Sequence, residues 1–172
     1  MWKSTMKKLV LLDADVIIDL HSLQLFDAIT RGYDVYVVRT VFREARFYPY
    51  KDQALPIDIK DKVTIVDVLD EQLLKKVKLE AREAFLGIDP GETESIAYLS
   101  TSVKNILFCT CDHSAIQLIS YMELEHTSIS VEKALEGIGR HGKNLYPRHR
   151  EKVFRDNINK GKILRIQYKK MF

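Results

Sequence analysis

The chain contains few cysteines, prolines and glycines, and it has no long apolar run. Its 172 residues include two Cys, four Pro and seven Gly, without an internal repeat or a Pro/Gly-rich linker. No apolar run approaches the roughly 18 residues that cross a bilayer, and the basic start Met1–Lys8 leads into only four apolar residues before Asp13. We therefore expect neither a membrane span nor a secretion signal. Cys109 and Cys111 stand one residue apart, where a disulfide would be strained, so we expect free thiols in a reducing cytoplasm.

Charge is distributed unevenly along the chain, whose net charge is +3. Residues 1–137 carry 16 Lys or Arg against 22 Asp or Glu (−6), whereas residues 138–172 carry 11 against 2 (+9). We predict a domain over residues 1–137 and a basic C-terminal extension over residues 138–172 that packs on the same domain. Such an arrangement suits an enzyme with a carboxylate centre and a polyanionic substrate. The predicted nucleic-acid contacts are Arg140, Lys143, Arg148 and Arg150; the alternative is that a terminal helix keeps a solvated charged face.

Short apolar runs alternate with helical patterns along the chain. Leu9–Leu12 and Val35–Val38 are typical of strands buried on both faces, and Asn105–Cys111 repeats the pattern. Further strands are predicted over Val63–Val68 and Thr127–Ser130. Helical residues are predicted to follow the first strand through Leu23 to Thr30, where Gly32 stops them. Further helices are predicted over Asp70–Phe85, Ala115–Met122 and Val131–Leu135, besides one beginning near Glu92. This order predicts an α/β fold with a mostly parallel sheet between helices.

Three segments fit this alternation less simply. Thr40 is predicted to cap a helix that carries Val41, Glu44 and Tyr48 and ends at Pro49. Residues 52–61 are predicted to be irregular. Leu164–Tyr168 alternates in the manner of an edge strand, which predicts that this part of the extension packs on the body instead of binding RNA.

Two carboxylates follow buried strands directly: Asp13 after Leu12, and Asp112 after Cys111. Ligands of parallel sheets bind beyond the carboxyl ends of the strands, so these two acids should face one another at that edge. Their repulsion is relieved if a cation lies between them. Glu92 follows the tight Pro90–Gly91 step, and Glu44 comes from the helix after the second strand. Four acids without paired His or Cys ligands favour Mg²⁺ or Mn²⁺.

Each acid also has a structural alternative. Asp89 and Glu92 fit a capping box with Pro90 at the first helical position. Asp112 could cap the helix at Ala115, Asp15 could cap its own helix, and Glu44 could be a surface residue. Because caps and ligands both place an oxygen at a helix N-terminus on the same edge, the two roles are compatible.

Four segments, in order, resemble the motifs of the PIN-domain family of metal-dependent nucleases, which includes toxin-like ribonucleases of bacteria and archaea. They are Asp13–Ile18, Val38–Glu44, Asp89–Ala97 and Phe108–Asp112, and the match covers roughly residues 9–129. The resemblance implies a three-layer α/β/α sandwich and a divalent-metal-dependent endoribonuclease that hydrolyses RNA phosphodiester bonds. It also implies a homodimer and, in many members, a toxin neutralised by a small antitoxin.

The resemblance assigns roles to individual residues. The implied catalytic acids are Asp13, Glu44, Glu92 and Asp112, of which Asp13, Glu92 and Asp112 hold the metal. Thr110 is implied as a supporting hydroxyl. Asp15 stands where Asn is common, and Glu94 competes with Glu92, although only Glu92 keeps the usual spacing to Ile96–Ala97.

Two other functions compete with the ribonuclease. Asp13 and Asp15 also resemble the nucleophile motif of haloacid-dehalogenase-type phosphatases, but Asp112 lacks the acidic partner that this class needs. The second is a non-catalytic PIN-like module that binds RNA or protein, which would lack at least one acid.

Cysteine and histidine offer weaker patterns. Zinc binding by Cys109, Cys111 and His113 lacks a second ligand pair, so buried thiols are favoured. His113, His141 and His149 have no orienting partner that the sequence identifies, so none is predicted to act as a base.

Overall fold

The computed structural model describes residues 6–101 and 104–169. Residues 1–5, at the start of the predicted nuclease domain, and residues 170–172, at the end of the predicted extension, lie outside the described residues. A five-stranded parallel sheet runs through the centre in the order β5-β2-β1-β6-β7. Its strands are β1 (Lys8–Leu12), β2 (Tyr33–Val38), β5 (Thr64–Val66), β6 (Ile106–Cys109) and β7 (Ser128–Ile129). The predicted parallel sheet is therefore confirmed, with β1 between β2 and β6.

Helices flank this sheet, and the predicted three-layer α/β/α sandwich is confirmed. They are α1 (Ala14–Ser22), α2 (Phe26–Gly32), α3 (Arg39–Glu44), α4 (Glu71–Glu83), α5 (Pro90–Thr101), α6 (His113–Tyr121), α7 (Val131–Glu136) and α8 (Glu151–Tyr168), with short 3-10 helices at Glu125–Thr127 and Pro147–His149. The apolar run of β1 is fully enclosed: Val10, Leu11 and Leu12 are at most 1% exposed. None of the helices in residues 6–101 and 104–169 is both long and apolar enough to cross a membrane.

The predicted helix through Tyr48 is wrong, because α3 ends at Glu44 and the chain turns into an antiparallel hairpin. Strand β3 (Phe47–Tyr50) pairs with β4 (Gln53–Pro56), so residues 53–56 are not irregular as predicted. The turn residues Lys51 and Asp52 have positive φ angles of 44° and 61°, the backbone that tight hairpins require. Aromatic side chains favour the strand here, and Pro49 is tolerated because the hairpin has only two strands. The predicted cap is also displaced, since Val38 rather than Thr40 precedes α3.

Two further expectations are corrected by the helices. The helical residues predicted through Leu23 to Thr30 are interrupted between α1 and α2, where Gln24 has a φ of 58°. Leu164–Tyr168 belongs to α8 and is not an edge strand.

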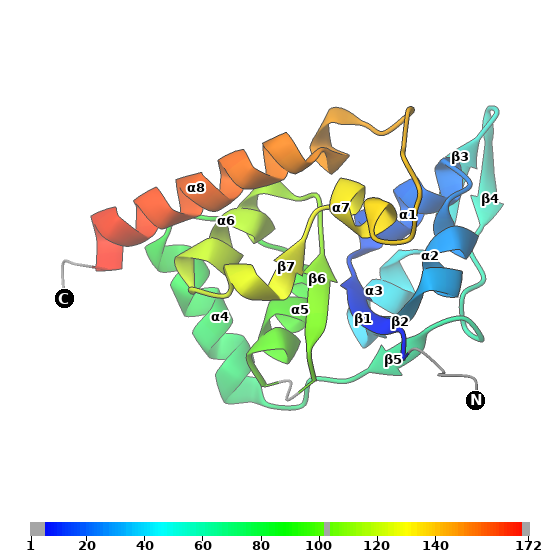
Figure 1. Ribbon diagram of the computed structural model, residues 1–172. Helices are drawn as coiled ribbons and strands as arrows, with labels where there is room; N and C mark the ends of the chain where they lie inside the picture. The colour runs from blue at the N-terminus through cyan, green and yellow to red at the C-terminus, as the bar shows by residue number, and fades with distance from the viewer. Residues whose placement is uncertain (1–5, 102–103, 170–172) are drawn as a thin grey trace.

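Helix α8 packs along α6 (Figure 1). Gly161 permits this approach, because a Cβ there would collide with the backbone oxygen of Gln117. The side chain of Gln117 also donates a 2.7 Å hydrogen bond to Asn157, and Ser120 donates one of 2.7 Å to the Ile158 carbonyl. The hairpin β3–β4 projects at the other end of the molecule from the last turns of α8 (Figure 1).

Candidate functional site

Asp13 lies where the central strand β1 ends, and it caps α1. Its Oδ1 accepts a 2.8 Å hydrogen bond from the Ala14 N–H, and its Oδ2 accepts one of 2.8 Å from the Thr110 hydroxyl. The residue is only 4% exposed, and burial raises the pKa of its carboxyl group to about 7. The cap of this helix is therefore Asp13 and not Asp15 as the alternative predicted. Thr110 makes the supporting contact that the resemblance implied.

Glu92 lies in the first turn of α5, in the capping box that the sequence indicated. Its Oε2 accepts the Asp89 N–H at 2.9 Å, while Asp89 Oδ1 accepts the Glu92 N–H at 2.8 Å. Glu92 is 5% exposed. Burial, followed by the charges of Asp112 and Asp13, raises the pKa of its carboxyl group to about 8. Asp112 and Asp13, the other two acids predicted as metal ligands, are thus within electrostatic reach of Glu92.

Asp112 reaches the same edge from the neighbouring strand. Strand β6 pairs with β1 and ends at Cys109, so Asp112 lies beyond the strand and not directly at its end as predicted. It caps α6 by accepting the Ala115 N–H at 2.9 Å, as the alternative expected. Its own N–H donates to the Thr110 hydroxyl at 3.2 Å. Thr110 therefore connects the loops that carry Asp13 and Asp112.

Glu44, the last residue of α3, lies against the start of α5. A Cβ built on Gly91 would be 2.9 Å from Glu44 Oε2, so a larger residue there would require the Glu44 side chain to move. Burial and the negative charges of Asp89, Asp15 and Glu94 raise the pKa of Glu44. Glu94 accepts the Thr40 N–H at 3.3 Å. Between the two competing acids, Glu92 is the one within electrostatic reach of Asp13 and Asp112.

We call Asp13, Glu44, Asp89, Glu92 and Asp112 the acid rim. Asp89 was predicted only as a cap, but its charge acts on Asp13, Glu44 and Glu92. In the described residues, no Lys, Arg or His side chain makes a hydrogen bond or ion pair with Asp13 or Glu92. The sequence signal for Asp89 was its place before the Pro-Gly step, which brings the α5 N-terminus to this edge.

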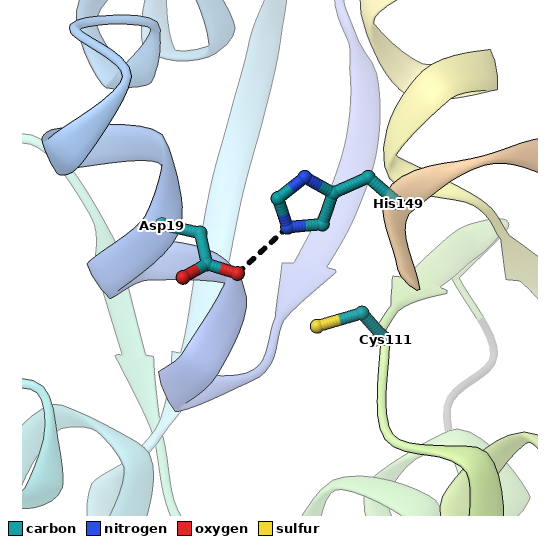
Figure 2. Close-up of side chains that lie close together, drawn as sticks. All are labelled: Asp19, Cys111 and His149. Atoms are coloured by element: carbon teal, nitrogen blue, oxygen red, sulfur yellow. Dashed lines mark hydrogen bonds and ion pairs between the residues drawn. The ribbon is translucent and has the colours of Figure 1, made fainter. Parts of the chain in front are cut away.

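A different group of potential ligands lies close together beneath the rim. In the part of the chain that the structure describes, Asp19, Cys111 and His149 form the one group whose three donor atoms all lie within 4.8 Å of one another. Figure 2 shows His149 and Asp19 pointing toward each other, with Cys111 beside them. The distance from His149 Nε2 to Asp19 Oδ2 is 2.6 Å. The sequence identified no orienting partner for His149, and the structure supplies one, Asp19, which lies 130 positions away in the sequence.

The hydrogen bonds favour an ion-paired clamp over a metal site at this second group. The Tyr146 N–H donates to His149 Nδ1 at 3.2 Å, which leaves the imidazole proton on Nε2, facing Asp19. A metal at Nε2 would displace that proton and leave the Tyr146 N–H facing another donor. Arg148 also binds Asp19 through Nε and Nη2 at 3.0 and 2.8 Å, and burial raises the pKa of the Cys111 thiol to about 12. We call Asp19, Arg148 and His149 the clamp.

The predicted nucleic-acid contacts fall into two pairs. Arg148 belongs to the clamp, and Arg150 binds Glu132 at 2.9 Å. Arg140 and Lys143 are exposed and form no ion pair with the described residues. Cys109 and Cys111 are both free and buried, as expected.

No model of a known protein family matches the chain, and no curated protein matches its sequence.

Proposed function

We propose that the chain is a cytoplasmic, divalent-metal-dependent endoribonuclease of the PIN-domain type, with its metal held by Asp13, Glu92 and Asp112. One observation carries the proposal: two buried acids, Asp13 and Glu92, share an edge of the sheet and have no basic partner among the described residues. Buried charges are ordinarily paired or bound to metal. A cation from solution would supply the missing partner.

The donor atoms of the rim fit a hard cation. They are carboxylate oxygens, supported by the Thr110 hydroxyl. Oxygen ligands of this kind are typical of Mg²⁺ or Mn²⁺ sites. No three acids of the rim, all within the described residues, meet the 4.8 Å limit that the Asp19 group meets. Mg²⁺ commonly keeps several waters and binds through one or two carboxylates, so its carboxylate ligands can lie farther apart than this limit. A bound ion would activate water and stabilise charge that builds on a phosphodiester.

The other residues would act through position and proton affinity. Thr110 fixes the orientation of Asp13, and the Asp89 N–H fixes that of Glu92. Glu44 forms no side-chain hydrogen bond with a described residue and has a raised pKa, which suits a group that takes a proton from water. Arg140 and Lys143 remain free to contact phosphates of RNA. A homodimer and neutralisation by a small antitoxin belong to the same proposal.

The decisive experiment is an RNA-cleavage assay of the purified protein with Mg²⁺, Mn²⁺ or EDTA. We expect cleavage of single-stranded RNA with either ion, and none with EDTA. Glu92→Gln should abolish cleavage, whereas Asp34→Asn, at the opposite end of the parallel strands, should not. Absence of divalent-dependent cleavage of any RNA by the wild type would refute the proposal.

The same preparation distinguishes the phosphatase alternative. If it hydrolyses p-nitrophenyl phosphate in a manner that requires both Asp13 and Asp15, and leaves RNA intact, a haloacid-dehalogenase-type activity is the better explanation. If the protein binds RNA but cuts neither RNA nor phosphate monoesters, the non-catalytic PIN-like module is the better explanation.

A further inference from the structure

The hairpin β3–β4 has two different faces. On one face, the Tyr48 ring lies 5.4 Å from the His21 ring, and the Tyr50 hydroxyl accepts a 3.1 Å hydrogen bond from Gln24. These contacts hold the hairpin against α1 and the turn that follows it. On the other face, Phe47 is 58% exposed. The exposed Phe47 ring therefore lies on a strand whose opposite face is held by the contacts of Tyr48 and Tyr50.

A pocket of about 630 Å³ lies where the hairpin leaves α3. Its apolar lining includes Phe42, Ile57 and Ile59, and its polar lining consists of Arg43, Arg46 and Asp58 beside the Phe47 ring. We call this pocket the hairpin groove. It combines an apolar lining with an exposed aromatic ring and two guanidinium groups.

The two arginines of the groove are exposed, and the charge of Arg43 acts on Asp67 from a distance. Neither Arg43 nor Arg46 forms a side-chain hydrogen bond or an ion pair with a described residue. Arg39, one turn earlier on α3, is instead bound to Asp67 by two hydrogen bonds of 2.9 Å. Although residues 1–137 carry a net charge of −6, these two arginines place exposed positive charge at the groove. That charge is complementary to a polyanion.

The groove continues in both directions. Arg43 also lines a pocket of about 420 Å³ that includes Pro90, Thr93 and Glu94 at the start of α5, beside the acid rim. Phe47 also lines a pocket of about 770 Å³ on the far side of the hairpin. Three hollows therefore follow one another and are joined by Arg43 and Phe47. An extended chain lying in them would pass from the hairpin to the start of α5, the helix that carries Glu92.

We propose that the hairpin groove binds a single-stranded segment of RNA, with Phe47 stacking on a base and Arg43 and Arg46 contacting the flanking phosphates. Aromatic rings beside cations are the usual means by which proteins bind single strands without reading their sequence. The inference rests on the proposed function, since it names the path by which a substrate would reach the acid rim.

The test measures binding separately from cleavage. Fluorescence anisotropy with a labelled single-stranded RNA, in EDTA and at several salt concentrations, reports affinity and its salt dependence. Phe47→Ala should weaken binding about tenfold with an unchanged salt slope. Arg43→Gln combined with Arg46→Gln should weaken binding and reduce the slope by about 1.4, since each phosphate contact on a single strand contributes about 0.7.

Matched controls lie on α4 and just after it, at positions that line none of the three pockets. Lys75→Gln with Arg82→Gln removes the same number of exposed positive charges, and Phe85→Ala removes another exposed aromatic ring. Both should bind RNA as the wild type does. Circular dichroism and thermal melting establish that each variant is folded.

Three outcomes would overturn the proposal that the hairpin groove binds RNA. In the first, the groove variants bind RNA as tightly as the wild type does, and in the second the wild type binds no RNA. In the third, Phe47→Ala dissociates a dimer but binds RNA normally. The last result would make this face an interface between two copies of the chain. If the groove variants lose RNA binding but the wild type never cuts RNA with divalent ions, the ribonuclease proposal fails and the groove stands. If wild type and groove variants cut RNA equally well at subsaturating RNA, the groove proposal fails and the ribonuclease proposal stands.

Discussion

Two aspartates on the same short helix show how differently the chain treats a buried negative charge. Asp13 caps the start of α1 and Asp19 lies near its end, and they are 4% and 6% exposed. Asp19 is bound by Arg148 and by His149 Nε2. Asp13 receives hydrogen bonds only from neutral groups, the Ala14 N–H and the Thr110 hydroxyl.

The difference separates structure from chemistry. The chain supplies its own cation to Asp19 and thereby fastens the segment before α8 to α1. It supplies none to Asp13, whose charge is opposed by burial and by nearby Asp89 and Asp15. A buried carboxylate left in this state is unfavourable unless something from solution binds it. Removing the negative charge should therefore have opposite consequences at the two positions.

The largest effect is expected from Asp13→Asn on catalysis. Removing a residue that only hydrogen-bonds to a metal ligand typically lowers metal affinity or activity 10–100-fold. Loss of a direct ligand should therefore reduce divalent-dependent RNA cleavage by roughly 100-fold or more. Asp19→Asn is the matched control on the same helix. The comparison predicts that its folded fraction retains activity. Initial rates at saturating Mn²⁺ measure both, and equal activity of Asp13→Asn and wild type would contradict the metal role.

Stability should respond in the opposite order. Asp19→Asn leaves Arg148 and the buried His149 without their carboxylate and should lower the free energy of unfolding by about 2 kcal/mol. This is less than the 3–5 kcal/mol typical of a fully buried pair, because the Arg148 side chain is 42% exposed. Asp13→Asn removes a charge that burial opposes, so the metal-free variant should be at least as stable as wild type. Urea unfolding in EDTA measures both variants. A large loss of stability in Asp13→Asn alone would reverse the comparison.

The pH dependence of stability should also reveal the acid rim. The pKa values of Asp13 and Glu92 rise from ordinary values of 3.8 and 4.5 to about 7 and about 8. The folded protein then binds more protons than the unfolded chain between about pH 4 and pH 8, so its stability falls as the pH rises through this window. Because each unit of raised pKa contributes about 1.4 kcal/mol, the loss should amount to several kcal/mol. Thermal melting in EDTA at several pH values measures it.

Mn²⁺ and Asp13→Asn provide the controls for that pH profile. Added Mn²⁺ should restore stability at the upper end of the window, because it compensates the carboxylates once they ionise. Asp13→Asn should flatten the profile in EDTA, whereas Asp34→Asn should leave it unchanged. A wild-type profile without a decline toward pH 8 would show that these acids are not held in an unfavourable state.

The sequence predicted one of the two aspartates and missed the other, for a physical reason. Asp13 follows an apolar strand directly, and the alternation of strands with helices predicts which edge of the sheet it reaches. Local pattern thus located Asp13, Asp112 and the Asp89–Glu92 box. Asp19 looked like one more polar residue in an apolar helix, because its partners Arg148 and His149 are about 130 positions away. No periodicity encodes such a long-range pair.

The errors in secondary structure have the same origin. Val41, Glu44 and Tyr48 have helical spacing, but the turn at Lys51–Asp52 lets Phe47–Tyr50 pair with β4 instead. Leu164–Tyr168 alternates as a strand would, yet it belongs to α8, which runs against α6. In both segments, contacts with residues elsewhere in the fold outweigh the local preference.

The smallest expected effect concerns Arg148, which was predicted to contact RNA and is instead found in the clamp. Arg148→Gln removes the guanidinium but leaves His149 on Asp19, so unfolding should become easier by only about 1 kcal/mol, as for a partly exposed pair. Because the Arg148 charge is already engaged, the salt slope of RNA binding should stay close to that of wild type. Arg140→Gln, which removes a cation with no partner in the described residues, should leave stability unchanged and reduce the slope by roughly 0.7. Urea unfolding and RNA titrations at several salt concentrations test both variants. A slope reduced by Arg148→Gln with unchanged stability would mean that Asp19 does not hold this arginine in solution, and the contrast between the two aspartates would then rest on His149 alone.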